Sequence, residues 1–82
     1  MEVYNLSNRN ELIAVIEELD SIRVPLEKLK EKSGIEIDEY GTSRLYLDHI
    51  KFIISCGVQS NQWKEIFEIA IKEKCGLLII GD

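Results

Sequence analysis

The chain has 82 residues, with 15 acidic and 10 basic side chains, so its formal net charge is −5 with the single histidine neutral. Apolar residues make up 45% of the chain and charged residues 30%, an ordinary globular composition that excludes intrinsic disorder and low-complexity classes. Apolar runs such as Phe52–Ile54 and Leu77–Ile80 fall far short of the about 20 residues that a membrane span needs. We therefore expect one small domain over residues 1–82.

The first segment, Glu2–Leu6, alternates polar and apolar side chains with a period of two, which predicts a short strand. Asn8 then suits a helix N-cap, because Glu11 follows it three residues later. Four apolar residues come next at helical spacing, namely Leu12, Val15, Ile16 and Leu19. This spacing predicts a helix that buries one stripe.

Pro25 interrupts that helix, because proline disfavours helical geometry at the residue before it and donates no backbone hydrogen bond. We expect a break near residues 21–24 and a second helix from Pro25 to about Ser33. Gly34 suits the position just after the helix. A single kinked helix is the alternative.

The segment Gly34–Tyr40 alternates again and predicts a half-buried strand, with Ile35 and Ile37 on its inner face. Gly41–Ser43 supplies turn residues, and Arg44–Asp48 is expected to run back as a further strand.

The segment Ile50–Cys56 is rich in β-branched and apolar residues, which is typical of a central strand that is covered on both faces. In the alternative reading Ser43 is an N-cap and residues 44–56 form a helix that ends at Gly57. Short apolar runs discriminate poorly between these two readings.

Gly57–Asn61 is expected to be a loop, followed by a helix over about residues 61–74 and a strand at Leu77–Ile80. The resulting order is β, broken helix, β, β, helix, β. This is the ferredoxin-like βαββαβ pattern of an α+β domain, with helices on one face of a mixed sheet. In it, residues 50–80 form a right-handed crossover between parallel strands.

Negative charge gathers in residues 35–48, where four acidic side chains stand against Arg44 alone. An acidic chain repels phosphate backbones, so direct nucleic-acid binding is not expected. Aromatic residues beside charges are common at protein interfaces. We therefore expect a docking face for a basic partner made of Glu36, Asp38, Glu39, Tyr40, Tyr46 and Asp48.

A second candidate site is the loop before the last helix. Free backbone N–H groups at a helix N-terminus can hold an anion, and this loop would follow the carboxyl end of a central strand. The residues expected to form this anion or ligand loop are Gly57, Gln59, Ser60 and Asn61.

Catalytic and metal sites are not expected. A nucleophile–base pair would have to combine Cys56, Cys75 or a serine with His49, the only histidine. Two cysteines without paired spacing do not make a zinc site, and no phosphate-binding glycine motif is present. The cysteines are expected to be reduced thiols.

Small size, clustered charge and the lack of a catalytic constellation predict a non-enzymatic cytoplasmic interaction protein without a cofactor. More specifically, we expect an inhibitor or immunity-type protein that docks on a basic partner such as a nuclease toxin. The alternative is a ligand-binding regulatory module of ferredoxin-like type that acts as a homodimer.

Overall fold

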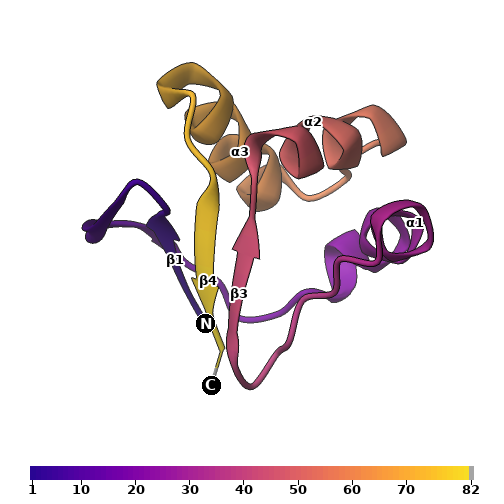
Figure 1. Cartoon of the computed structure of the whole chain (residues 1–82), viewed down its shortest axis with the longest axis horizontal. Helices are drawn as coiled ribbons and strands as arrows, with labels where there is room; N and C mark the ends of the chain where they lie inside the picture. Colours follow the sequence, from indigo (N-terminus) through magenta and orange to yellow (C-terminus); the bar gives the residue numbers. More distant parts are fainter. Residues whose placement is uncertain (82) are drawn as a thin grey trace.

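The structure is a computed structural model that describes residues 1–81 (Figure 1). Its elements in chain order are β1 (Glu2–Asn5), β2 (Asn8–Val15), the 3-10 helix η1 (Asp20–Ile22), α1 (Arg23–Ser33), β3 (Thr42–Leu45), α2 (Leu47–Cys56), α3 (Asn61–Glu73) and β4 (Leu77–Ile80). The four strands form one antiparallel sheet in the order β2-β1-β4-β3. The described residues therefore have the α+β architecture that the sequence predicts.

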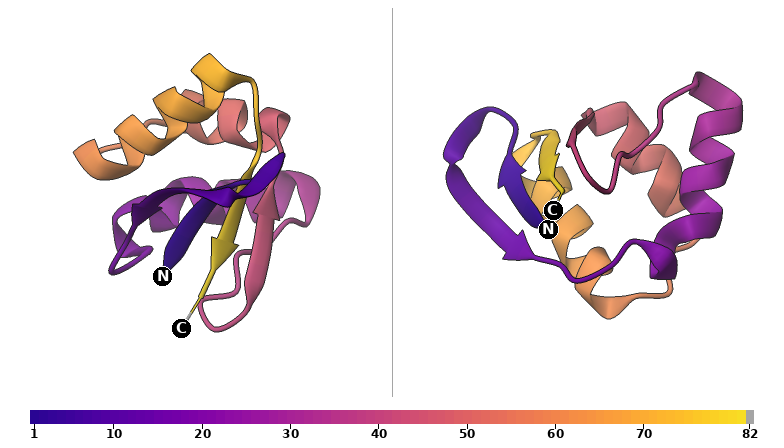
Figure 2. Two further views of the ribbon diagram at one scale, coloured as in Figure 1. Left: turned by 90° about the vertical axis from the view of Figure 1, so that its left-hand side faces the viewer. Right: turned by 90° about the horizontal axis from the view of Figure 1, so that it is seen from below.

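The register of the central strands determines which side chains enter the core. Ile79 of β4 pairs with Val3 of β1, and Leu77 pairs with Leu45 of β3. All four side chains are fully buried, and they share one face of the sheet because directly opposite residues point the same way. Figure 2 shows the helices gathered on this side of the sheet.

The opposite face of the sheet is more open. Leu12 and Val15 of β2 have exposed fractions of 49% and 57%, and Tyr4 is half-buried. Leu78 lies between its cross-strand partners Tyr4 and Arg44 on this face and is buried. Successive side chains of β4 thus point to opposite faces of the sheet, but the sequence shows no polar–apolar alternation because apolar residues occupy both faces.

The helix predicted from Asn8 is wrong, because this segment is strand β2. The side-chain carbonyl of Asn5 accepts backbone N–H groups of Ser7 at 2.9 Å and Asn8 at 3.3 Å, which closes a tight turn. The Asn5 amide also donates to Glu11 at 3.3 Å. These bonds fold β2 back onto β1, and pairing in the sheet overrides the helical spacing of the apolar residues.

The second predicted helix is confirmed. It begins two residues before Pro25, which lies in the first turn of α1 where its missing N–H costs little. Gly34 ends the helix in the left-handed conformation with φ of 75°, and its N–H donates to the Lys30 carbonyl at 2.8 Å. A break at η1, rather than one kinked helix, separates α1 from the preceding segment.

The central strand predicted at Ile50–Cys56 is wrong, because these residues belong to helix α2. Ile50 and Ile53 are fully buried three residues apart on one helix face, whereas Ile54 is 42% exposed. The helical alternative is closer, but the N-cap is Tyr46 rather than Ser43. The helix ends before Gly57, as that alternative expects.

The strand predicted at Gly34–Tyr40 does not form. Ile35 and Ile37 are half-buried against the core, so the segment does present one apolar side, but it pairs with no strand of the described sheet. The following strand β3 covers Thr42–Leu45, slightly earlier than the predicted Arg44–Asp48.

The last helix and strand are confirmed. Ser60 caps α3 by accepting the Trp63 backbone N–H at 3.2 Å. The rings of Trp63 and Phe67 stack with centroids 5.4 Å apart in the core, and the Trp63 indole N–H donates to the Glu18 carbonyl at 3.4 Å. These contacts attach α3 to the segment that follows β2.

The predicted ferredoxin-like order is not confirmed. The elements run β, β, α, β, α, α, β after the 3-10 turn is set aside, and the sheet is antiparallel rather than mixed. With residues 50–56 helical, the predicted parallel crossover of residues 50–80 does not occur. Within residues 1–81 no helix combines the length and apolar character needed to cross a bilayer.

Candidate docking surface

Three adjoining hollows lie beside the connection from α1 to β3, which faces α1 in two of them and the segment before α1 in the other. Glu39 lines all three, and their volumes are about 280, 200 and 540 Å³. We call this surface the acidic groove. It is lined by Met1, Glu17, Glu18, Leu19, Asp20, Arg23, Leu26, Glu27, Lys30, Glu36, Ile37, Asp38, Glu39 and Tyr40.

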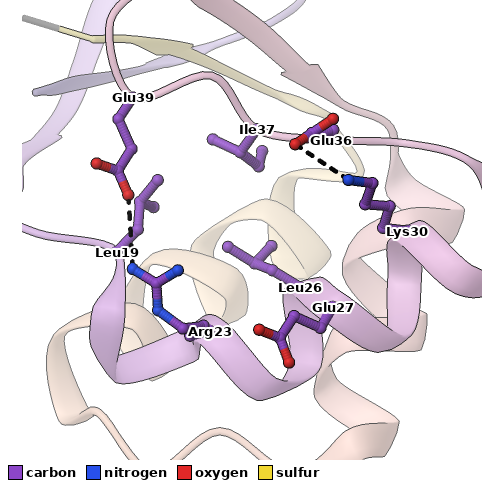
Figure 3. A pocket seen from close by; sticks show the side chains of 8 residues that line it. All are labelled: Leu19, Arg23, Leu26, Glu27, Lys30, Glu36, Ile37 and Glu39. Carbon is purple, nitrogen blue, oxygen red and sulfur yellow. Dashed lines mark ion pairs between the residues drawn. The ribbon is translucent and has the colours of Figure 1, made fainter.

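The first hollow lies between two ion pairs (Figure 3), and three apolar side chains line it beside five charged ones. Arg23 Nη2 lies 3.8 Å from Glu39 Oε1 at one end, and Lys30 Nζ lies 3.3 Å from Glu36 Oε1 at the other. Figure 3 shows the side chains of Leu26 and Ile37 between the two pairs. We call this first hollow the slot.

Leu19 completes the apolar lining beside the pair of Arg23 and Glu39. Arg23 also donates to Asp20 from Nε at 3.1 Å and from Nη2. The hydrogen bond and charge of Asp20 raise the Arg23 pKa, with a smaller contribution from Glu39. Arg23 is therefore shared between two carboxylates.

The acidic groove carries the whole charge excess of the chain. Seven carboxylates line it, whereas its only basic side chains are Arg23 and Lys30. That excess of five equals the formal net charge of the full chain, so the charged residues outside the groove balance. The formal excess of negative charge is therefore carried by the residues of this groove.

Tyr40 stands at the rim of the groove with 81% of its surface exposed. Its backbone N–H donates to the Asp38 carboxylate at 2.9 Å, and the Asp38 N–H donates to the Ser43 hydroxyl at 2.8 Å. At the base of this turn, the Gly81 N–H donates to the Gly41 carbonyl at 2.7 Å. The turn that carries Tyr40 is therefore joined to the sheet by a hydrogen bond to the Ser43 side chain and by one between the backbones of Gly81 and Gly41.

The structure brings together four of the six predicted partner-binding residues, namely Glu36, Asp38, Glu39 and Tyr40. It separates Tyr46 and Asp48 from them. Tyr46 and Asp48 lie at the start of α2, just after the last residue of β3, which pairs with Leu77. The other four residues precede the first residue of β3, which pairs with Ile80 at the opposite end of the strand. The length of β3 keeps the two groups about 13 Å apart.

Sequence reasoning missed the other acidic side chains of the groove. These side chains are Glu17, Glu18, Asp20 and Glu27. The available signal was the dense run of three carboxylates just before Pro25. The sequence does not show that this run lies near residues 36–39, because that proximity depends on α1 folding the chain back toward it.

The predicted anion loop connects α2 to α3, not a strand to a helix, so the expected position at the end of a central strand is wrong. Gly57 has φ of 93°, and the Ser60 hydroxyl already accepts the Trp63 N–H. Gln59 and Asn61 are exposed. A hollow of about 300 Å³ beside the loop is lined largely by Ile54, Gly57, Val58, Gln59, Lys64 and Phe67.

The candidate catalytic residues do not meet. His49 and Cys56 lie near opposite ends of α2, about 10 Å apart along its axis. His49 Nδ1 accepts the Tyr46 backbone N–H at 3.2 Å at the start of the helix. Cys75 is a buried free thiol whose pKa is raised mainly by burial. Among residues 1–81, no three His, Cys, Asp or Glu side chains lie close enough together to hold a metal ion.

Comparisons of the chain with protein-family models, with curated proteins and with solved structures find no significant match.

Proposed function

We propose that this chain is a small non-enzymatic interaction protein that docks its acidic groove on a basic partner. The type we infer is an inhibitor or immunity-type protein of the cytoplasm, with the cationic cleft of a nuclease toxin as the kind of surface that it would cover. The observation that carries the proposal is the collection of the entire charge excess on one hollowed surface beside the exposed ring of Tyr40.

Charge and shape act together in this proposal. A one-sided negative field steers a cationic partner and raises the association rate, most strongly at low ionic strength. Exposed tyrosines supply large contact area at low entropic cost and are frequent hot spots of interfaces. The hydrogen bonds that join the turn carrying Tyr40 to the sheet limit the ordering that docking would require.

The test compares two charge reversals of equal size. One variant changes Glu36, Asp38 and Glu39 to lysine, and the matched control changes three exposed acids of α3, Glu65, Glu68 and Glu73. The probe is the protein that co-purifies with the wild-type chain from its native host, identified by mass spectrometry. Association is measured by stopped flow at low and at high salt.

We expect the groove variant to associate about tenfold to a hundredfold more slowly at low salt, and the α3 control to change far less. High salt should narrow the difference because it screens the exposed charges. Equal slowing of both variants would show that only net charge matters, and the assignment of the docking surface would then be abandoned.

Self-association through the open sheet face is a second candidate, favoured by the exposure of Leu12 and Val15 on one edge strand. In this reading the chain is a homodimeric regulatory module that binds a small ligand, built on the antiparallel sheet described above rather than on a ferredoxin-like one. Size-exclusion chromatography with light scattering separates the two candidates. A dimer that is lost in Val15→Lys, but kept when the equally exposed Val24 of α1 is changed to lysine, supports the second.

A further inference from the structure

The slot has room for one inserted side chain. Its volume is about 280 Å³, and it adjoins the two other hollows of the acidic groove. Its apolar lining consists of Leu19, Leu26 and Ile37, and the charged side chains stand around its rim. An apolar side chain can enter this space while polar neighbours remain at the solvent boundary.

Two carboxylates at the rim of the slot, Glu39 and Glu36, already form ion pairs with cations of α1. Arg23 and Lys30, which meet Glu39 and Glu36, are seven residues apart on α1. Two helical turns rise about 10 Å, so the backbones of the two residues that supply these cations lie about 10 Å apart along α1. The side chains of Glu39 and Glu36 remain 46% and 67% exposed, which leaves room for a second cation at each.

From this geometry we propose that the slot binds one face of a basic amphipathic helix, with cationic residues at positions i and i+7 and an apolar residue at i+4. Positions i and i+7 of a helix share a face and are also about 10 Å apart, and i+4 lies between them. The cations meet Glu39 and Glu36, and the apolar side chain enters between Leu26 and Ile37. This inference rests on the proposed function and names the chemistry of the partner segment.

The test uses two synthetic helical peptides of about 16 alanine-rich residues and of identical composition. The matched peptide has arginine at i and i+7 and leucine at i+4, whereas the permuted peptide has arginine at i and i+5, which places the second charge on another face. Binding to the full chain is followed by amide chemical shifts at low salt. We expect the matched peptide to bind about tenfold more tightly.

Paired variants of the chain locate the site. Glu36→Gln should lower the affinity for the matched peptide toward that for the permuted peptide. Glu31→Gln should leave the affinity unchanged, because Glu31 is an exposed residue of α1 outside the groove. Ile37→Ser should likewise weaken it more than Ile35→Ser, because both residues are half-buried in the same connection but only Ile37 lines the slot.

Each outcome decides the inference. Tighter binding of the matched peptide, lost in the slot variants alone, supports it. Equal binding of both peptides overturns the spacing but leaves the acidic docking surface in place. Absence of binding by either peptide overturns the helix-binding slot, and the proposed function then depends on the kinetic comparison of the charge-reversed variants.

Discussion

Replacing Ile53 with alanine should cost far more stability than replacing its neighbour Ile54. Ile53 is fully buried between α2 and the core, whereas Ile54 is 42% exposed. Truncating a fully buried isoleucine costs about 2–5 kcal/mol, because transfer free energy is lost and a cavity is left. For Ile54 about half of the transfer term applies and alanine's better helix propensity offsets part of it, so we expect about 1 kcal/mol or less.

The assay is urea denaturation followed by fluorescence of Trp63, the only tryptophan, which is buried and therefore reports the core. A domain of this length has a free energy of unfolding of about 4–12 kcal/mol, so Ile53→Ala should shift the midpoint strongly. The comparison also tests the fold, because a central strand covered on both faces would bury both isoleucines. Equal losses in the two variants would refute helix α2 as described.

Three further changes test other parts of the fold. Lys74 ends α3 with φ of 53°, so Lys74→Gly should stabilise the protein by about 0.5–1 kcal/mol, seen as a higher Tm; a lower Tm would show that no strain is stored there. Gly76→Ala should cost about 1–3 kcal/mol in urea, because a Cβ would lie 2.6 Å from the Leu45 carbonyl oxygen, and an unchanged midpoint would contradict this contact. At pH 8, iodoacetamide should alkylate half-buried Cys56 first and buried Cys75 only on unfolding, a difference that mass spectrometry detects. Because burial raises the Cys75 pKa, its contribution to stability should hold below the ordinary thiol pKa and decline as pH rises above it.

Capping and strong periodicity were readable from the sequence. Pro25 lies in the first turn of α1 and Gly34 caps its end, and the apolar spacing from Trp63 onward specifies α3. Helix caps and helical periodicity are local signals, so they can be interpreted without knowing how distant segments pack. The first and last strands, which are short alternating or wholly apolar segments, were also placed well.

Two errors came from patterns that two structures share. Leu12 and Val15 fit a helical stripe, but the Asn5 turn pairs their segment with β1 and leaves both side chains on the open face of the sheet. The run around Ile53 has strand composition, yet its helix needs only one covered face. In both cases long-range packing decided between local readings of similar free energy.

The sequence predicted only part of the candidate surface. Residues 36–40 form a local cluster that sequence alone revealed, while Tyr46 and Asp48 were grouped with it because they are near in sequence. Their separation by β3, and the approach of Glu17 and Glu18 from the other side, follow from chain reversals. A sequence pattern does not encode those reversals directly.

Met1 and Gly81 both border the candidate surface. Met1 lines the acidic groove, and Gly81 hydrogen-bonds the base of the turn that carries Tyr40. An affinity tag or fluorescent fusion attached before Met1 would thus stand beside the groove and compete with docking. Binding experiments call for cleavable tags, or for labels on the outer side of α3, and a small environment-sensitive dye at Met1 would itself report engagement.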